Sequence, residues 1–149
     1  MIDPIDASWA RQERLPIPQA RPVVCVVCER RGAPDSTRRA LCVHCGRDVA
    51  AMRGHVASVT WAAEERASRA WAVLEARIPD DPDHPLRKRW DAYQSALSSP
   101  RAKATEQAAD RPNDDPLFVL VRLWLEYRAA ADAYTDRLAW ERRCEEALQ

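Results

Sequence analysis

The chain has 149 residues, of which 46% are hydrophobic, and its 23 basic and 23 acidic residues give a formal net charge of zero. This balance excludes a general attraction of the whole surface to nucleic acid or to an anionic membrane. Only three glycines occur, and the abundant Ala, Arg, Glu and Leu residues favour helix, so the composition predicts a mainly α protein. The longest strongly apolar run, Leu117 to Val121, is too short to span a bilayer, and the first residues lack the apolar core of a secretory signal. We therefore expect a cytoplasmic protein that does not enter a membrane.

Residues 1–22 are rich in proline and contain a single tryptophan, Trp9. Proline at this density favours an extended arm over a helix. Such an arm can lie along a partner surface, with Trp9 as its anchor. The rest of the chain divides into a four-cysteine module at 23–50 and a helical part at 48–149.

The four-cysteine module contains two C-x2-C pairs, Cys25 with Cys28 and Cys42 with Cys45. Each pair can place two sulfur atoms on one cation, and the intervening loop can fold back to complete a tetrahedron. Four thiolates leave no open position, which indicates a structural site holding one Zn²⁺ ion. A rubredoxin-like iron or an iron–sulfur cluster is the alternative, because thiolate ligation alone does not fix the metal.

The string LCVHCG at the second pair leads directly into a helical pattern, which would place Cys45 at the N-terminus of the first long helix. A cysteine knuckle, a loop and then C-x-x-C at a helix start resemble the treble-clef class of zinc fingers. LCVHCG is also similar to the second half of a GATA-type finger. The resemblance covers residues 23–55. The loop between the pairs is short and no aromatic residue follows Gly46, so only the four metal ligands carry over, and not the DNA reading of that family.

The helical part shows apolar residues at steps of three and four. One such stripe predicts a long helix from about Asp48 to Ile78, and Pro85 is expected to begin a shorter helix that ends before Ser98. A polar linker or a loose helix is expected near 99–115. From Asp115, a plausible N-cap, the heptad pattern of the last helix is regular as far as Leu138. The predicted architecture is a small treble-clef-like zinc module followed by a long-helix hairpin or a three-helix bundle.

The zinc module carries more arginines than acidic residues, and no aromatic residues lie between them. The functional interpretation is a phosphate-contacting surface, and the alternative is an ordinary solvated loop. The candidate nucleic-acid-binding residues are Arg30, Arg31, Arg38, Arg39 and Arg47.

Six tryptophans are many for this length and suggest contact with a protein partner. Trp9 and Trp140 are the predicted partner-binding residues, whereas Trp71, Trp90 and Trp124 are expected to fill a helical core. The heptad seam at 116–140 can bury itself within the chain or pair with a second copy as a homodimer. One interpretation is thus a protein-binding adaptor or inhibitor in which zinc is purely structural.

No glycine-rich phosphate loop, nucleophile elbow or H-E-x-x-H motif is present, so we do not expect an enzyme. The favoured function is a non-enzymatic zinc-binding regulator that contacts DNA or a nucleic-acid-handling protein, with transcription control as the setting.

Overall fold

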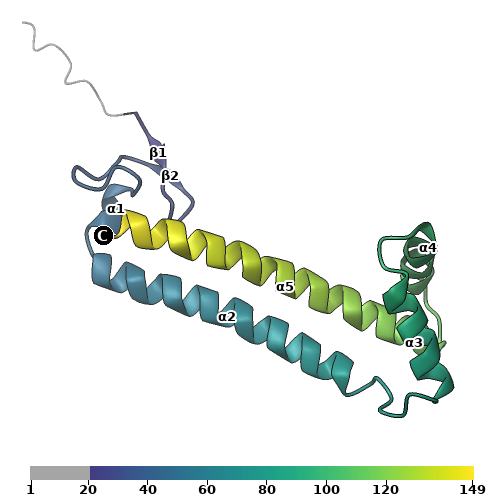
Figure 1. The fold of residues 1–149 in the computed structure, drawn as a ribbon. Coiled ribbons are helices and arrows are strands. Elements are labelled where there is room, and N and C mark those ends of the chain that lie inside the picture. The colour runs from purple at the N-terminus through teal and green to yellow at the C-terminus, as the bar shows by residue number, and fades with distance from the viewer. Residues whose placement is uncertain (1–20) are drawn as a thin grey trace, which may run out of the picture.

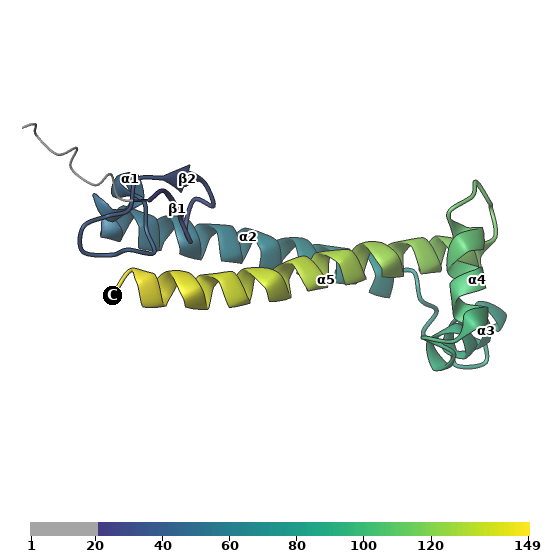
Figure 2. The same cartoon turned by 90° about the horizontal axis from the view of Figure 1, so that it is seen from above.

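A computed structural model describes residues 21–149, so Trp9 and nearly all of the predicted arm lie outside the described residues. Two long helices, α2 (Val49–Glu75) and α5 (Pro116–Ala147), run antiparallel and form a stalk (Figures 1 and 2). A small module sits at one end of the stalk, and a pair of short helices sits at the other. The prediction of a mainly helical chain with a long-helix hairpin is confirmed.

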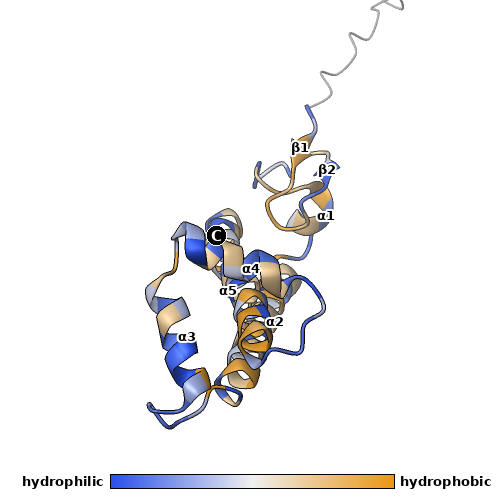
Figure 3. Cartoon of the chain, turned by 90° about the vertical axis from the view of Figure 1, so that its right-hand side faces the viewer, coloured by the Kyte–Doolittle hydropathy of each residue, from blue (hydrophilic) through white to orange (hydrophobic). Residues whose placement is uncertain are grey.

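The module contains two short antiparallel strands and a single helical turn. Strand β1 (Val23–Val24) pairs with β2 (Arg31–Gly32), and α1 (Val43–Gly46) follows the second strand. At the far end lie α3 (Pro85–Ser95) and α4 (Pro100–Ala109). In the end-on view of Figure 3, hydrophobic residues are prominent along α2, whereas α3 is mostly hydrophilic.

Helix α2 begins where the side chain of Asp48 accepts a hydrogen bond of 3.0 Å from the amide of Ala51, which satisfies one of the unpaired donors of the first turn. Its buried stripe includes Val56, Ala63 and Ala67. Small residues such as these alanines allow a neighbouring helix to approach closely.

Helix α5 turns its heptad seam toward α2. Leu117 and Leu120 of this seam are buried, and the ring of Tyr127 lies 5.1 Å from that of Trp71 on α2. The seam is therefore used inside the chain. Of the two alternatives that the sequence leaves open, burial within the chain is the one seen here, and a homodimer through residues 116–140 stays a prediction.

The end of the stalk away from the module has its own apolar core, the distal cluster. Its buried members come from α2, α3, α4 and α5: Leu74, Trp90, Tyr93, Ala102, Ala109, Leu117, Leu120 and Val121. Near 99–115, where the sequence left a polar linker or a loose helix open, the chain is helical at Pro100–Ala109. Ser99 caps α4 and Pro100 is its first residue, while Ala102 and Ala109 give an otherwise polar helix a side that packs into the distal cluster.

The tryptophans differ in burial from what the sequence suggests. Trp90 is 5% exposed, as predicted for a core residue, but Trp71 is 40% exposed and Trp61 is 60% exposed. The prediction that Trp71 fills the core was wrong, because a stalk of two helices covers only the stripe between them. Within residues 21–149, every helix is too short or too polar to cross a membrane.

We predict that Asp115→Ala lowers the free energy of unfolding by about 1–2 kcal/mol. The Asp115 carboxylate accepts a hydrogen bond from the amide of Leu117 and pairs with the guanidinium of Arg89 at 2.8 Å. Urea denaturation at neutral pH measures the loss. Asp115→Asn, which keeps a capping oxygen without the charge, should lose less.

The loss of stability in Asp115→Ala should depend on pH. The hydrogen bonds from Arg89 and from the Leu117 amide hold the pKa of the Asp115 carboxyl below its usual value. The carboxylate therefore stabilises the fold above its unfolded-state pKa, and this contribution is lost as the pH falls through the folded-state pKa. The stability difference between wild type and Asp115→Ala should shrink in acid, and a difference that grows there would contradict this assignment.

Candidate metal centre

The first cysteine pair lies in the turn between β1 and β2. The Cys25 amide donates to the carbonyl of Arg30 at 2.9 Å, and the Glu29 amide donates to the carbonyl of Cys25 at 2.8 Å. Glu29 has a left-handed backbone, with a φ of 59°, and this reverses the chain directly after Cys28. The turn brings both thiols of the pair to the same side.

The second pair lies at the single turn α1. Cys42 is the N-cap, and its sulfur accepts a hydrogen bond of 3.5 Å from the amide of Cys45. The sequence predicted Cys45 at the start of the long helix, but the chain leaves α1 after Gly46, and α2 starts afresh with Asp48 as its cap. The second pair is therefore one short connection away from α2.

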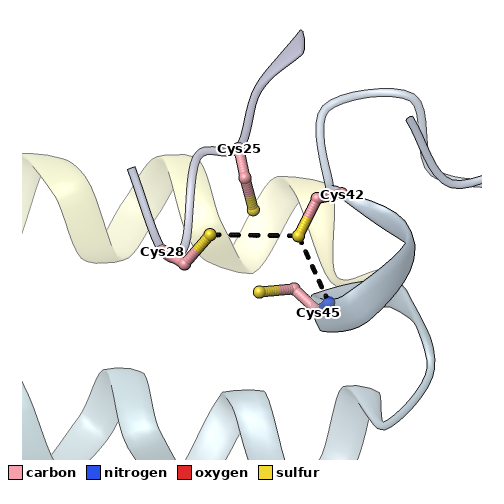
Figure 4. Close-up of side chains that lie close together, drawn as sticks. All are labelled: Cys25, Cys28, Cys42 and Cys45. Carbon is pink, nitrogen blue, oxygen red and sulfur yellow. Dashed lines mark hydrogen bonds between the residues drawn. The ribbon is translucent and has the colours of Figure 1, made fainter. Parts of the chain in front are cut away.

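The four sulfur atoms face one another and form a compact cluster (Figure 4). All of them lie within 4.8 Å of one another, and the sulfur atoms of Cys28 and Cys42 are 3.8 Å apart. A tetrahedral site with metal–sulfur bonds of about 2.3 Å requires sulfur–sulfur distances of about 3.8 Å. The geometry therefore suits one metal ion held by four cysteines.

The cluster is shielded from solvent, since Cys25, Cys42 and Cys45 are buried. Burial raises the pKa of the Cys45 and Cys28 thiols above their usual value. Burial acts in the same direction on Cys25, but backbone hydrogen bonds, led by that from Cys28, outweigh it and lower the pKa of Cys25 to about 7. Four closely packed thiols cannot all ionise unaided, whereas a divalent cation would stabilise them together as thiolates.

Asp35 lies in the loop between the two cysteine pairs, with its side chain next to Gly46. Its carboxylate accepts hydrogen bonds from the amides of Thr37 and Arg38, at 3.1 and 2.8 Å. The hydrogen bond from the Arg38 amide is the largest of the effects that lower the pKa of Asp35, and the charge of the Arg38 guanidinium acts in the same direction. Gly46 makes room for this side chain, because a β-carbon at position 46 would lie 2.5 Å from the Asp35 carboxylate.

The first knuckle also rests on the C-terminal part of α5. The indole Nε1–H of Trp140 donates to the carbonyl of Val26 at 2.7 Å, and the thiol of Cys144 lies 3.5 Å from the same oxygen. The guanidinium of Arg137 stacks over the Trp140 ring at 4.8 Å and approaches Glu29 at 4.0 Å. We call this contact the α5 clamp.

Trp140 is only 3% exposed. The prediction that it binds a partner is therefore wrong, because its ring is used to hold the module on the stalk. Cys144 is fully buried beside it. Around the clamp lies the proximal cluster, whose buried members are Cys25, Val27, Leu41, Cys42, Cys45, Val56, Trp140, Cys144 and Leu148.

The five candidate arginines occupy different parts of the module surface. Arg30 and Arg31 line a hollow of about 350 Å³ together with Cys28, Cys42 and His44. Arg39 and Arg47 are exposed elsewhere on the module, and Arg38 is half-buried with a buried Nε that has no hydrogen-bond partner. Among residues 21–149, none of the five forms a salt bridge with a carboxylate. The structure gathers two of them with His44 and leaves the other three apart from that hollow.

Sequence reasoning missed the α5 clamp, although the sequence contains a signal for it. Trp140, Cys144 and Leu148 are spaced by four residues. They begin where the heptad seam of α5 weakens, at Glu141 and Glu145. A second apolar stripe that starts as the first one ends indicates a new packing partner on a different side of the helix.

Comparisons with known proteins add no family to this geometry. No protein-family model matches the chain, and searches of curated proteins and of solved structures found no match. The resemblance to treble-clef fingers stays a prediction, and the site is defined by its own four sulfur atoms.

We predict that chelation of the metal, or Cys42→Ser, exposes the backbone of residues 23–47 to hydrogen exchange. The proximal ends of α2 and α5 should lose protection as well, because they share the proximal cluster with the module. The distal cluster should keep its protection, because it contains none of the four cysteines.

Cys144→Ser is the matched control for this experiment. It replaces the fifth cysteine and leaves all four ligands in place, so the variant should retain one metal ion per chain. Unchanged exchange at 23–47 after complete metal removal would contradict the role of the metal in organising the module.

A glycine pair tests the close approach of Asp35. Gly46→Ala should destabilise the module and weaken metal retention, because the new methyl group overlaps the Asp35 carboxylate. Gly54→Ala adds the same methyl group on α2 where no atom lies within 4 Å, and it should stabilise the protein by about 0.5–1 kcal/mol. Competition with a chromophoric chelator and thermal unfolding measure the two effects, and equal behaviour of the two variants would contradict this explanation.

Proposed function

We propose that the four cysteines hold a single structural Zn²⁺ ion and that the module contacts the phosphate backbone of duplex DNA. Zinc suits a closed site of four thiolates, and such a site leaves no position for a substrate or an activated water molecule. The proposed role of the module is thus binding and not catalysis. We take transcription control as its setting.

The observation that supports DNA contact is a difference between the two kinds of charged side chain in the module: the acidic ones have partners within the protein, whereas the arginines form no salt bridges among residues 21–149. Glu29 approaches Arg137, Asp35 accepts backbone amides, and Asp48 caps α2. Each acidic side chain thus has a role inside the protein. The arginines at 30, 31, 38, 39 and 47 form no salt bridge among residues 21–149, and only Arg38 interacts electrostatically with a nearby carboxylate, that of Asp35, so most of this charge is left to the solvent or to a ligand.

The hollow beside the zinc ligands is the best-defined place for a phosphate contact. Arg30 and Arg31 line it with His44, and Val43 adds a partly exposed apolar side chain. Arginine binds phosphate oxygens in a bidentate manner, and such contacts fix position on a duplex without reading its sequence. We therefore expect binding with little sequence preference from this hollow alone.

A test of this proposal is the affinity of zinc-loaded protein for a labelled DNA duplex, measured by fluorescence anisotropy from about 50 mM to 200 mM salt. The affinity should fall steeply with salt. Arg30→Ala combined with Arg31→Ala should weaken binding and reduce the slope of log affinity against log salt by about two. The pair Arg38→Ala and Arg39→Ala should act in the same direction.

Arg66→Ala combined with Arg69→Ala is the matched control, because it removes two exposed arginines from the middle of α2. Its binding should equal that of the wild type. An absence of binding at the lowest salt, or an equal loss in the control, would contradict DNA contact by the module.

Contact with a protein partner is a second candidate function, which corresponds to an adaptor. The observation that favours it is the exposure of Trp61 and Trp71 on the stalk, since exposed tryptophans are frequent anchors in protein interfaces. The two functions use different parts of the molecule and do not exclude each other.

A further inference from the structure

A hollow in the middle of the stalk, between α2 and α5, lies outside the proximal and distal clusters. Its volume is about 340 Å³, at the lower end of the range of ligand pockets in proteins. Three of its lining side chains are aromatic, one is acidic and the others are small. We call it the aromatic hollow, and its walls and floor are formed by Glu64, Ala67 and Trp71 of α2 and by Tyr127, Ala131 and Tyr134 of α5.

The register of the two helices explains the shape of the aromatic hollow. Trp71 lies beside Tyr127, and the centres of their rings are 5.1 Å apart. Because α2 and α5 run antiparallel, seven residues back along α2 correspond to seven residues forward along α5, which places Glu64 opposite Tyr134. The hollow therefore has a pair of large side chains at each end, about 10 Å apart along the stalk, with the small residues between them.

The aromatic rings of the hollow are accessible to a ligand. Trp71 is 40% exposed, and Tyr127 and Tyr134 are half-buried. The planes of the Trp71 and Tyr127 rings are inclined at 56°, so the two rings form a corner and do not stack flat on each other. The face of an aromatic ring carries partial negative charge, and it attracts a lysine or arginine side chain that comes close to it.

The charge of the hollow selects the same kind of ligand. Among residues 21–149, no lysine or arginine lines the hollow, and the exposed carboxylate of Glu64 forms no salt bridge. Its neighbour Glu65, in contrast, pairs with Arg69 at 2.8 Å. Glu64 would repel an anion, and a neutral ligand would remove water from this carboxylate without replacing it by a partner. A positively charged group satisfies both the carboxylate and the rings.

We propose that the aromatic hollow binds the positively charged side chain, lysine or arginine, of a protein partner. Glu64 and Ser68 at its border are exposed, so a side chain can enter from the solvent while its main chain stays outside. Trp61 lies one turn before Glu64 and is 60% exposed, in reach of apolar residues that flank the inserted side chain. The proposal rests on the adaptor role described above and is independent of DNA contact by the module.

The main test is an NMR titration of the zinc-loaded full chain, followed by the indole Nε1–H signal of Trp71. The probe is a capped pentapeptide with lysine at its centre, leucine at both ends and glycine between them. In the control peptide norleucine replaces lysine, which keeps the apolar stem and removes the charge. The lysine peptide should bind saturably, and the norleucine peptide should bind at least about tenfold more weakly.

Equal affinities of the two peptides would overturn the cation site. They would still support an adaptor that anchors an apolar partner on its tryptophans, so failure of the cation site is distinguishable from failure of the adaptor role. The titration contains no DNA, and its result is therefore separate from that of the anisotropy experiment.

Substitutions test the two kinds of wall separately. Trp71→Leu keeps an apolar side chain but removes the ring, and it should weaken binding of the lysine peptide by about three- to tenfold, with other signals of the hollow as the readout. Glu64→Gln should weaken it by about threefold. Tyr134→Phe keeps the ring and should bind as the wild type does. Glu146→Gln, the matched control, removes an exposed carboxylate near the end of α5 and should have no effect. Circular dichroism and metal content establish that each variant is folded.

A second titration distinguishes the side chain of a partner from a free organic cation. Tetramethylammonium chloride, exchanged against sodium chloride at constant ionic strength, should bind at least about tenfold more weakly than the lysine peptide, because it contacts the hollow alone. Trp61→Ala should weaken the peptide by about fivefold and leave tetramethylammonium unchanged. Tetramethylammonium that binds as tightly as the peptide, a peptide affinity insensitive to Trp61→Ala, or no binding of the lysine peptide would overturn the proposal.

Discussion

The fold depends on the contacts among three parts of the chain at one end of the stalk: the four-cysteine module, α2 and α5. The four sulfur atoms connect the two knuckles, α1 lies one short connection before α2, and Trp140 ties the first knuckle to α5 through the carbonyl of Val26. Two antiparallel helices with alanines at their contact bury little apolar surface, so their pairing alone is weak. The proximal cluster supplies the missing core at the open end of the hairpin, and the metal-binding knuckles form one wall of that cluster.

The distal end of the stalk is held together by an apolar core and does not use the cysteine cluster. The chain forms α3 and α4 between α2 and α5 in the sequence, and side chains of these two short helices enclose Leu74 and Leu120 at the end of the stalk. Aromatic rings extend this core along the stalk, from Tyr93 and Trp90 to Trp124, Tyr127 and finally Trp71. The stalk is thus fastened at both ends by different means. Its middle, which has only two layers, is where large apolar side chains remain exposed.

The sequence predicted the features that are encoded locally. The cysteine spacing identified four ligands that the structure brings together, and Pro85 and Asp115 marked two helix starts that the structure confirms. The packing role of Trp140 and the position of α4 could not be predicted from the local sequence. Both depend on which surface packs against them, and a partner more than a hundred residues away, such as Val26 for Trp140, leaves no local pattern. At 100–109 the residues are good helix formers but show no regular apolar stripe, so the sequence left a helix and a linker open, and the packing of two alanines decides for a helix.

The position of the metal centre bears on how the two exposed surfaces can work together. Because the module contacts both α2 and α5, its orientation relative to the stalk is fixed by the proximal cluster and not by a flexible linker. A basic module on a stiff stalk presents its arginines at a set distance from Trp61 and Trp71, which are exposed on α2. A ligand that touches the arginines and the exposed tryptophans together gains from this fixed spacing, because the first contact raises the effective concentration of the second.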